Sequence, residues 1–301
     1  MMLRLAMRMT KADVSAAQAW AVKAISAGTM TSNDHIAAVT HTDGPEGINK
    51  NGHGEVFDVD SQMRLSATFE SHLSGDPRLS VLFAPGSSNS VIVGMPNGST
   101  SDSYVSATTG LTVPGVTDRH VYAQTHPALR GKDVPMVFQT YAEVEFLKAE
   151  AAIRGWISSS AKEHYDKGVT AAMKMLKQLY PASTAITDAE ISAYLAGPGA
   201  YDASKGWEMA MNEYWKATFL NEYEAYANWR RTGYPTLTPT KHPNSVSNNQ
   251  IFRRMIYPGG ESATNGENYA AAVARQGADD FTTRMWSVSY THLRAHETVV
   301  Y

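Results

Sequence analysis

The sequence predicts an all-α protein of stacked helical hairpins of the tetratricopeptide-repeat type, carrying one long irregular loop insertion. Two capping boxes, at residues 160–163 and 187–190, each open a stretch that reads as a helix. Residues 141–153 have apolar side chains on two opposite faces, which is typical of a helix enclosed between neighbouring helices. By contrast, residues 84–135 are rich in Gly, Ser, Thr, Asn and Pro and show no helical period.

The composition is that of a globular protein able to bury a large core. The chain has 301 residues, of which 43% are hydrophobic and 18% charged, and its formal net charge is −3. Nucleic acid is therefore not an expected partner. The absence of cysteine excludes disulfides, thiolate metal sites and a cysteine nucleophile. We expect no metal site and no cofactor, because the spacing of His35, His41 and His53 matches no compact metal motif.

The N-terminal part is predicted to begin with a helical hairpin formed by residues 2–10 and 14–27. Asp13 is expected to cap the second of these helices, and Gly28 to end it. Residues 29–60 are expected to be mostly loop. Residues 61–73 are predicted to be helical, and a turn begins at the Asp-Pro pair that follows.

The insertion at residues 84–135 supplies the candidate binding residues. A long segment without a helical period, inside an otherwise helical chain, is more often functional than merely connecting. Asn97, Asp102, Tyr104 and Tyr122 carry side chains of the kinds that hydrogen-bond hydroxyl groups or stack on a sugar ring. We predict that these four residues bind the ligand; for each one singly, the alternative is a solvated surface loop.

A helical period of apolar residues returns after residue 140. The segment 141–153 and the helix that begins after Ser160 are joined by a turn at Gly155, and this pair resembles one tetratricopeptide repeat. A short helix is predicted after Thr187. Residues 235–260 are expected to be loop, and residues 268–276 to form a last helix.

One continuous helix is predicted from residue 212 to residue 229, a stretch without Gly or Pro that Gly233 and Pro235 then stop. An unpaired carboxylate on its aromatic face would be costly to bury, so Glu222 is expected to pair with Arg230 or Arg231 in a structural ion pair. At 100° per residue, one face of this helix carries Met211, Trp215, Phe219, Tyr226 and Trp229. Leu220 and Tyr223 lie well round the helix from that face, so the helix is expected to be buried on more than one side.

No catalytic residues are predicted. No nucleophile elbow, phosphate loop or separated pair of carboxylates stands out in the sequence. Asp279 and Asp280 are adjacent, and adjacent carboxylates do not converge on a substrate as the two acids of a glycosidase must, so a loop or capping role is expected for both.

Three strings carry a family resemblance, and they occur in the expected order. Residues 74–79 read SGDPRL, residues 141–156 read YAEVEFLKAEAAIRGW, and residues 219–235 read FLNEYEAYANWRRTGYP. Together they resemble the SusD/RagB-like outer-membrane lipoproteins of Bacteroidetes over most of residues 1–286. The resemblance implies a surface-exposed lipoprotein of the cell outer membrane. Such a protein binds an oligosaccharide or other nutrient and passes it to a SusC-like, TonB-dependent transporter, without turning it over.

Two other functions stay open on the sequence alone. One is an all-α glycoside hydrolase, in which the fold brings together two acids from different loops. The other is a helical-repeat scaffold that binds a second protein and no glycan.

The resemblance also implies domain limits. Residues 1–286 are expected to be the SusD-like domain, truncated at its N-terminus, so that the signal peptide and lipidated cysteine of the family are missing. Residues 288–298 read VSYTHLRAHET. Back-translated in one frame, this string matches the transposon-end adapter of sequencing libraries, so residues 287–301 are predicted to be a non-native tail.

Overall fold

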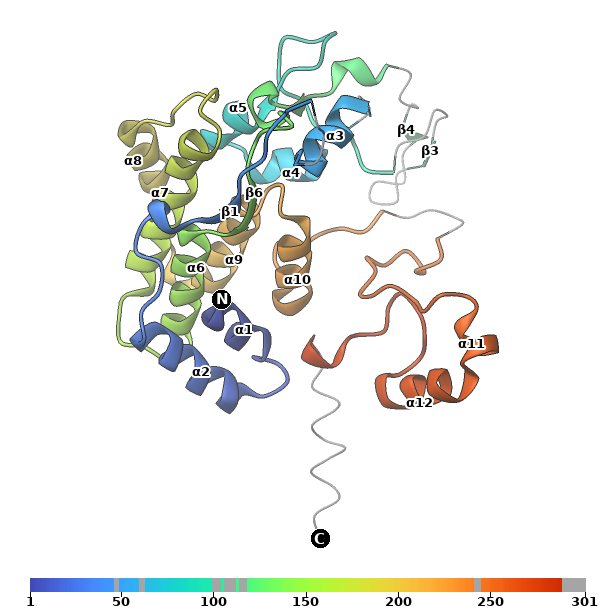
Figure 1. Cartoon of the computed structure of the whole chain (residues 1–301). Helices are drawn as coiled ribbons and strands as arrows, with labels where there is room; N and C mark the ends of the chain where they lie inside the picture. The colour runs from blue at the N-terminus through green and yellow to red at the C-terminus, as the bar shows by residue number, and fades with distance from the viewer. Residues whose placement is uncertain are drawn as a thin grey trace.

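Helices form the body of the molecule, as predicted, and short strands join its loops (Figure 1). The computed structural model describes residues 1–45, 49–59, 63–98, 104–105, 112–113, 118–240 and 245–288. The helices are α1 (Met2–Arg8), α2 (Val14–Ser26), α3 (Gly52–Val59), α4 (Ala67–His72), α5 (Arg78–Leu82), α6 (Tyr141–Ile153), α7 (Ala161–Leu179), α8 (Asp188–Ala196), α9 (Gly206–Ala217), α10 (Glu222–Thr232), α11 (Glu261–Thr264) and α12 (Gly266–Gln276).

The strands pair into antiparallel two-stranded sheets. β1 (Ala37–Val39) pairs with β6 (Met136–Gln139), β2 (Phe83–Ala84) with β5 (Gln124–Thr125), and β3 (Tyr104–Val105) with β4 (Thr112–Val113). No helix among the described ranges is long and apolar enough to cross a membrane.

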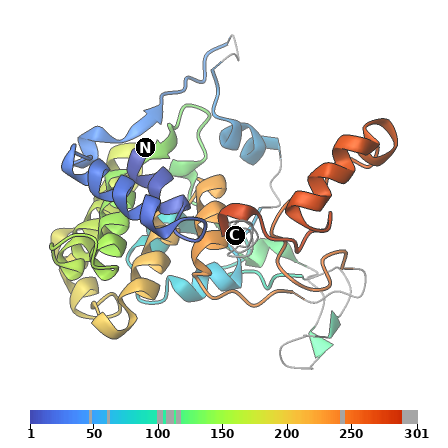
Figure 2. The ribbon, with the colours of Figure 1, turned by 90° about the horizontal axis from the view of Figure 1, so that it is seen from below.

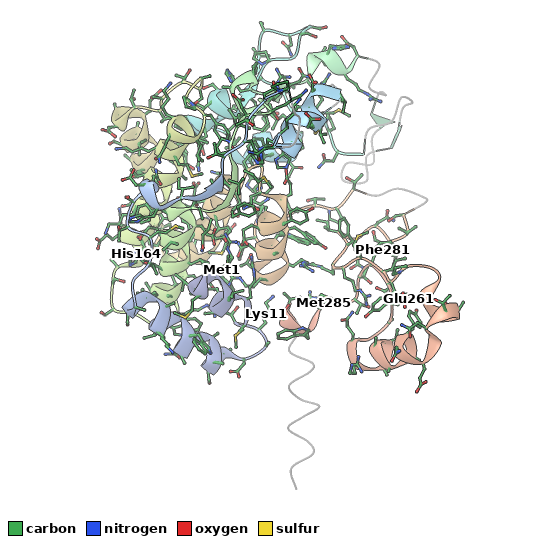
Figure 3. All side chains as sticks on the ribbon, viewed as in Figure 1. Met1, Lys11, His164, Glu261, Phe281 and Met285 are labelled. Atoms are coloured by element: carbon green, nitrogen blue, oxygen red, sulfur yellow. The ribbon has the colours of Figure 1, made fainter. Side chains whose placement is uncertain are left out.

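Antiparallel helix pairs build the core, which confirms the predicted hairpins. α1 packs against α2, and α6 packs against α7, α9 and α1, so α6 is enclosed as its two apolar faces predict. Side chains fill the space between these helices (Figure 3). The close approach of α6 and α7 requires glycine at residue 168, because a Cβ there would lie 2.6 Å from the ring of Phe146. Gly155, at φ +71°, makes the turn between the two helices.

Buried ion pairs join segments that are far apart in the sequence. Arg78 donates hydrogen bonds to Asp76 (Nη2 to Oδ2, 2.5 Å) and to Glu213 of α9 (Nη2 to Oε2, 2.6 Å). Lys216 also donates to Glu213 (2.7 Å), and Tyr194 of α8 donates to the same carboxylate oxygen (2.7 Å). The turn at residues 74–79 is thereby fixed to α8 and α9.

Two further clusters hold α6 in place. Arg231 of α10 forms a bidentate pair with Glu150 of α6, with both N–O distances at 2.7 Å. On the N-terminal side, Arg4 of α1 pairs with Glu143 of α6. Burial raises the pKa of Glu143. The free-energy cost of removing the carboxylate from water is larger than the stabilisation that the hydrogen bond and the positive charge of Arg4 provide.

The predicted continuous helix is wrong, because the chain breaks it into α9 and α10. Leu220 adopts φ +63°, a left-handed conformation that no α-helix contains. The Thr218 hydroxyl donates to the carbonyl oxygens of Tyr214 and Trp215 (both 3.0 Å), which satisfies acceptors at the end of α9. The break lets Phe219 pack against Phe69 and Phe83, with ring centroids 5.5 and 5.1 Å away.

The predicted partner of Glu222 is also wrong. Glu222 lies at the first position of α10, is exposed, and contacts Nε2 of His53 at 3.2 Å. Arg231 forms its ion pair with Glu150, and the guanidinium group of Arg230 lies over the ring of Tyr226. The expected burial on more than one side also fails in part, because Trp215 is only half-buried and Tyr223 is exposed.

Two N-terminal predictions need correction as well. Residues 52–59 form α3 where a loop is expected, because the Asn51 side chain accepts hydrogen bonds from the N–H groups of His53 and Gly54 and so caps the helix. The helix expected over residues 61–73 is confined to α4, which Ser66 caps. The hairpin of α1 and α2, with Asp13 as the cap, is confirmed.

The C-terminal part follows the prediction. Gly277 (φ +97°) ends α12, and Asp279 accepts hydrogen bonds from Arg254 and from the Tyr257 N–H, which is a loop role. Figures 1 and 2 place α11 and α12 away from the helical body. The 3₁₀ turn η5 (Trp286–Val288) contacts α10, and Val288 is buried. The domain limits stay a prediction. The non-native tail stays a prediction, and residues 289–301 lie outside the described residues.

Candidate functional site

An aromatic pocket of about 580 Å³ lies between α3, α4 and the junction of α9 with α10. This volume falls within the ~300–1,000 Å³ usual for ligand sites. The break at Leu220 creates one side of the pocket, because it turns the chain between Trp215 and Glu222. Five aromatic side chains line it: Phe57, Phe69, Phe83, Trp215 and Phe219.

The aromatic rings form a fixed floor. Phe69 meets Trp215 edge to face with centroids 4.7 Å apart, and it stacks on Phe219 at 5.5 Å. Phe83 meets Phe219 at 5.1 Å, and the pairing of β2 with β5 holds Phe83 opposite Thr125. Because Phe69 and Phe83 are buried while Trp215 and Phe219 are half-buried, the floor is anchored in the core and presents the latter two rings towards the pocket.

Polar groups surround this floor. The pocket is lined by the side chains of His53, Arg64, Ser66, Thr125, Thr218 and Glu222 in addition to the rings. Arg64 is held in place, since its Nε donates to the carbonyl oxygen of Arg119 at 2.8 Å. An apolar floor with a polar rim suits a ligand that has flat apolar faces and hydroxyl groups at its edges.

The helix α3 closes one side of the pocket and is attached through polar contacts. The Asn51 side chain donates to the Val134 carbonyl (3.0 Å), and Lys132 pairs with Asp58 of α3 (2.7 Å). At the pocket itself, the contact between His53 and Glu222 joins α3 to α10. The bond to Glu222 raises the pKa of His53, and the bond to His53 lowers the pKa of Glu222.

We expect the attachment of α3 to weaken as the pH rises. A raised His53 pKa contributes stability that is fully present below the unfolded-state pKa of about 6.5 and is lost as the pH rises through the folded-state value. After correction for intrinsic rates, hydrogen exchange should show stronger protection of the α3 amides near pH 6 than near pH 8. The variant His53→Gln should abolish this difference. A difference of equal size in His53→Gln would show that another group attaches α3.

The structure places two of the four predicted ligand residues near this pocket. Asn97 is exposed in a turn and lines a smaller neighbouring pocket of about 250 Å³, to which Arg64, Leu65 and Ser66 also belong. Tyr122 is half-buried and follows the 3₁₀ turn η2 (Arg119–Val121).

Backbone hydrogen bonds bring these two segments together. The Leu65 N–H donates to the Ala123 carbonyl (2.8 Å), and the Met95 N–H donates to the Leu65 carbonyl (2.6 Å). Tyr104 lies in β3 opposite Val113, and Asp102 lies outside the described residues. The role of all four as ligand contacts stays a prediction.

Sequence reasoning missed the aromatic pocket. Trp215 and Phe219 fall at helical spacing, which assigns them to a packed core face, and Phe57 falls in a segment taken for loop. Within the described part of the chain, no three His, Asp or Glu side chains are grouped so that they could hold a metal ion.

Comparison with known families gives one match over most of the chain. The family model SusD-like, described as starch-binding and associating with the outer membrane, matches residues 1–258. Comparison with curated protein sequences returns no match.

Solved structures with this fold cover almost the whole chain. A chitin-binding protein is 30% identical with a TM-score of 0.81, and the match covers 95% of this chain and 62% of that protein. A SusD-like protein of Bacteroidetes AC2a is 27% identical with a TM-score of 0.81, covering 95% and 67%. A SusD homologue from Bacteroides vulgatus is 25% identical with a TM-score of 0.74, covering 95% and 60%. The chain therefore spans less than two thirds of the length of the first of these proteins.

Proposed function

The chain belongs to the SusD-like family, and from this premise we propose that it captures an oligosaccharide and delivers it to a SusC-like, TonB-dependent transporter. The proposal includes a surface-exposed position at the cell outer membrane, attached as a lipoprotein. The observation that carries it is the aromatic pocket, which supplies a binding surface in a chain whose relatives include a chitin-binding protein.

The chemistry of a sugar fits this pocket. A pyranose ring has apolar faces of C–H groups and hydroxyls around its edge, so it needs an aromatic surface with polar groups at the rim. Phe57 and Trp215 supply the surface. Ser66, Thr218 and Arg64 supply hydroxyl and guanidinium groups for the hydroxyls.

The oligosaccharide is proposed to extend beyond the aromatic pocket. The pocket that contains Asn97 shares the lining residues Arg64, Leu65 and Ser66 with it, so the two pockets are neighbours. We propose that a chain with one sugar on the aromatic floor reaches Asn97 with its next units. In this proposal Asp102, Tyr104 and Tyr122 contact the same glycan further along.

The charged groups of the pocket favour binding over turnover. Glycoside hydrolysis requires two carboxyl groups on either side of the bond that is cleaved. Of the residues that line the aromatic pocket, Glu222 is the one carboxylate, and it is already paired with His53.

Replacing Phe57 with alanine should weaken glycan binding at least about tenfold, or roughly 1.4 kcal/mol, in calorimetric titrations with soluble chito- and malto-oligosaccharides. Phe57 is half-buried on the peripheral helix α3, so the fold should survive its truncation. The matched control is Phe138→Ala, which truncates an exposed phenylalanine of β6 outside the pocket and should leave affinity unchanged.

The outcomes separate the functions that remain open. Equal affinity of Phe57→Ala and Phe138→Ala would show that the aromatic pocket does not bind the glycan. A tenfold loss of affinity in Tyr104→Ala alone would place the site on the insertion. Shortened products after incubation would favour a glycoside hydrolase. Absence of binding to every glycan, together with capture of a protein other than the transporter, would favour a scaffold.

A further inference from the structure

A chain of hydrogen bonds joins a serine, a histidine and a glutamate in the hairpin of α6 and α7. The Ser159 hydroxyl contacts His164 Nε2 at 2.7 Å, and His164 Nδ1 contacts Glu145 Oε2 at 2.6 Å. Glu145 lies on α6, His164 lies in the first turn of α7 (Figure 3), and Ser159 lies in the loop between the two helices. These three residues form a serine cluster, which shares no residue with the lining of the aromatic pocket.

The protonation states within the serine cluster follow from its carboxylate. Burial would raise the pKa of Glu145, but the hydrogen bonds and charges of His164 and Lys148 outweigh it and lower this pKa. An ionised carboxylate can only accept hydrogen bonds, so His164 donates to it from Nδ1. In the neutral imidazole Nε2 is then the nitrogen without a proton, and the Ser159 hydroxyl donates to it. His164 Nε2 is therefore in position to take the proton of this hydroxyl.

The serine cluster combines a fixed base with an accessible hydroxyl group. Glu145 and His164 are buried between α6 and α7, and the close packing of these helices holds the imidazole ring in one place. Ser159 is exposed, so a molecule from solution can reach its side chain. A hydroxyl bonded to an imidazole, which a carboxylate orients in turn, is the arrangement that activates a serine as a nucleophile.

The start of α7 supplies hydrogen-bond donors next to this serine. Ser160 caps the helix by accepting from the Glu163 N–H at 3.3 Å. The N–H groups of Ala161 and Lys162, two and three residues after Ser159, donate to no acceptor in the described part of the chain. Free N–H groups at the N-terminus of a long helix stabilise negative charge. They are suited to the oxyanion that forms when a serine attacks a carbonyl group.

We propose that the serine cluster hydrolyses carboxylic esters, with Ser159 as the nucleophile and His164 as the general base. Ser159 Oγ attacks the carbonyl carbon of the ester, and its proton passes to His164 Nε2. The bond between that carbon and the alkoxy oxygen breaks, and His164 returns the proton to the departing alcohol. Water then attacks the acyl-serine in the same way, which releases the acid and restores the Ser159 hydroxyl. Glu145 is a positioning residue, because it orients the imidazole through Nδ1. This activity does not depend on glycan binding in the aromatic pocket.

Labelling of the full chain with a fluorophosphonate probe, together with hydrolysis of p-nitrophenyl acetate, tests this inference. We expect the probe to bond to Ser159, as located by peptide mass spectrometry, and the ester to be hydrolysed faster than in buffer. Ser159→Ala should abolish the labelling and lower the protein-catalysed rate at least about hundredfold. The matched control is Ser158→Ala, which truncates the exposed neighbouring serine and should leave both reactions unchanged.

Two further variants separate catalysis from folding, which circular dichroism monitors. His164→Gln removes the base and should slow both reactions at least about hundredfold. Glu145→Gln should lower kcat at least about tenfold and leave KM unchanged, because the amide still accepts from Nδ1 but does not stabilise the imidazolium ion. If either buried substitution prevents folding, Ser159→Ala decides alone, since Ser159 is exposed. Failure of the probe to label Ser159 in the folded parent protein, or equal ester hydrolysis by folded Ser159→Ala and Ser158→Ala, would overturn the inference and leave the hydrogen bonds a structural role.

Discussion

Replacing Arg78 with methionine is expected to lower the free energy of unfolding by about 3–5 kcal/mol, the cost of leaving buried charges without their partner. Arg78 is 1% exposed and bonds two buried carboxylates, those of Asp76 and Glu213. Burial alone would raise the pKa of Glu213, but Arg78 and Lys216 outweigh it and lower this pKa to about 2. Without Arg78, Lys216 alone would face both carboxylates. Urea denaturation at neutral pH measures the loss.

A second change tests the cause of that loss. In the double variant Arg78→Met with Glu213→Gln, one carboxylate is removed together with the cation, so part of the stability should return. Lys167→Met breaks an exposed pair with Glu163 and should leave the denaturation midpoint unchanged. A midpoint for Arg78→Met equal to that of Lys167→Met would contradict the view that the buried cluster stabilises the fold.

Replacing Arg231 with leucine is expected to cost about 3 kcal/mol, the lower part of the range for a broken buried pair. Arg231 and Glu150 are both 1% exposed, and they join α10 to α6. The effect is at the lower end because Arg154 also contacts Glu150 at 2.8 Å and retains part of the compensation. Arg231→Lys should recover little, since an ammonium group cannot form the bidentate contact.

The neighbouring residue provides the matched control. Arg230 bonds the carbonyl oxygen of Arg253 (3.1 Å) and, in the described part of the chain, pairs with no carboxylate. Arg230→Leu should therefore cost only about 1 kcal/mol, as for one ordinary hydrogen bond. Equal losses of unfolding free energy in the two variants would show that the bidentate pair stabilises the fold no more than an ordinary hydrogen bond does.

The sequence predicts the hairpin helices well because their signals are local. The capping box at Thr187 forms with both of its hydrogen bonds, and Ser160 caps α7 through the Glu163 N–H. The two-faced pattern of Tyr141–Ile153 identifies a helix enclosed by others, and its limits agree with α6. These features depend on residues within a few positions of one another.

The errors arise where distant contacts decide the local structure. The sequence around Leu220 contains no Gly or Pro, so nothing local indicates the turn that Phe219 makes to reach Phe69 and Phe83. Glu222 lies near two arginines in sequence, but α3 brings His53 to it from 169 positions away. Composition identifies the insertion as a candidate binding region. The aromatic pocket combines residues 53–69 and 215–225 with Phe83 and Thr125, so no single segment of the sequence indicates it.

A crystal structure of the protein with its tightest-binding oligosaccharide would show whether the aromatic pocket holds the glycan. We expect a sugar ring lying against Trp215 and Phe57, with its hydroxyls towards Ser66, Thr218 and Arg64 and its next unit beside Asn97. A sugar bound elsewhere, with no sugar in the aromatic pocket, would show that this pocket is not the glycan site.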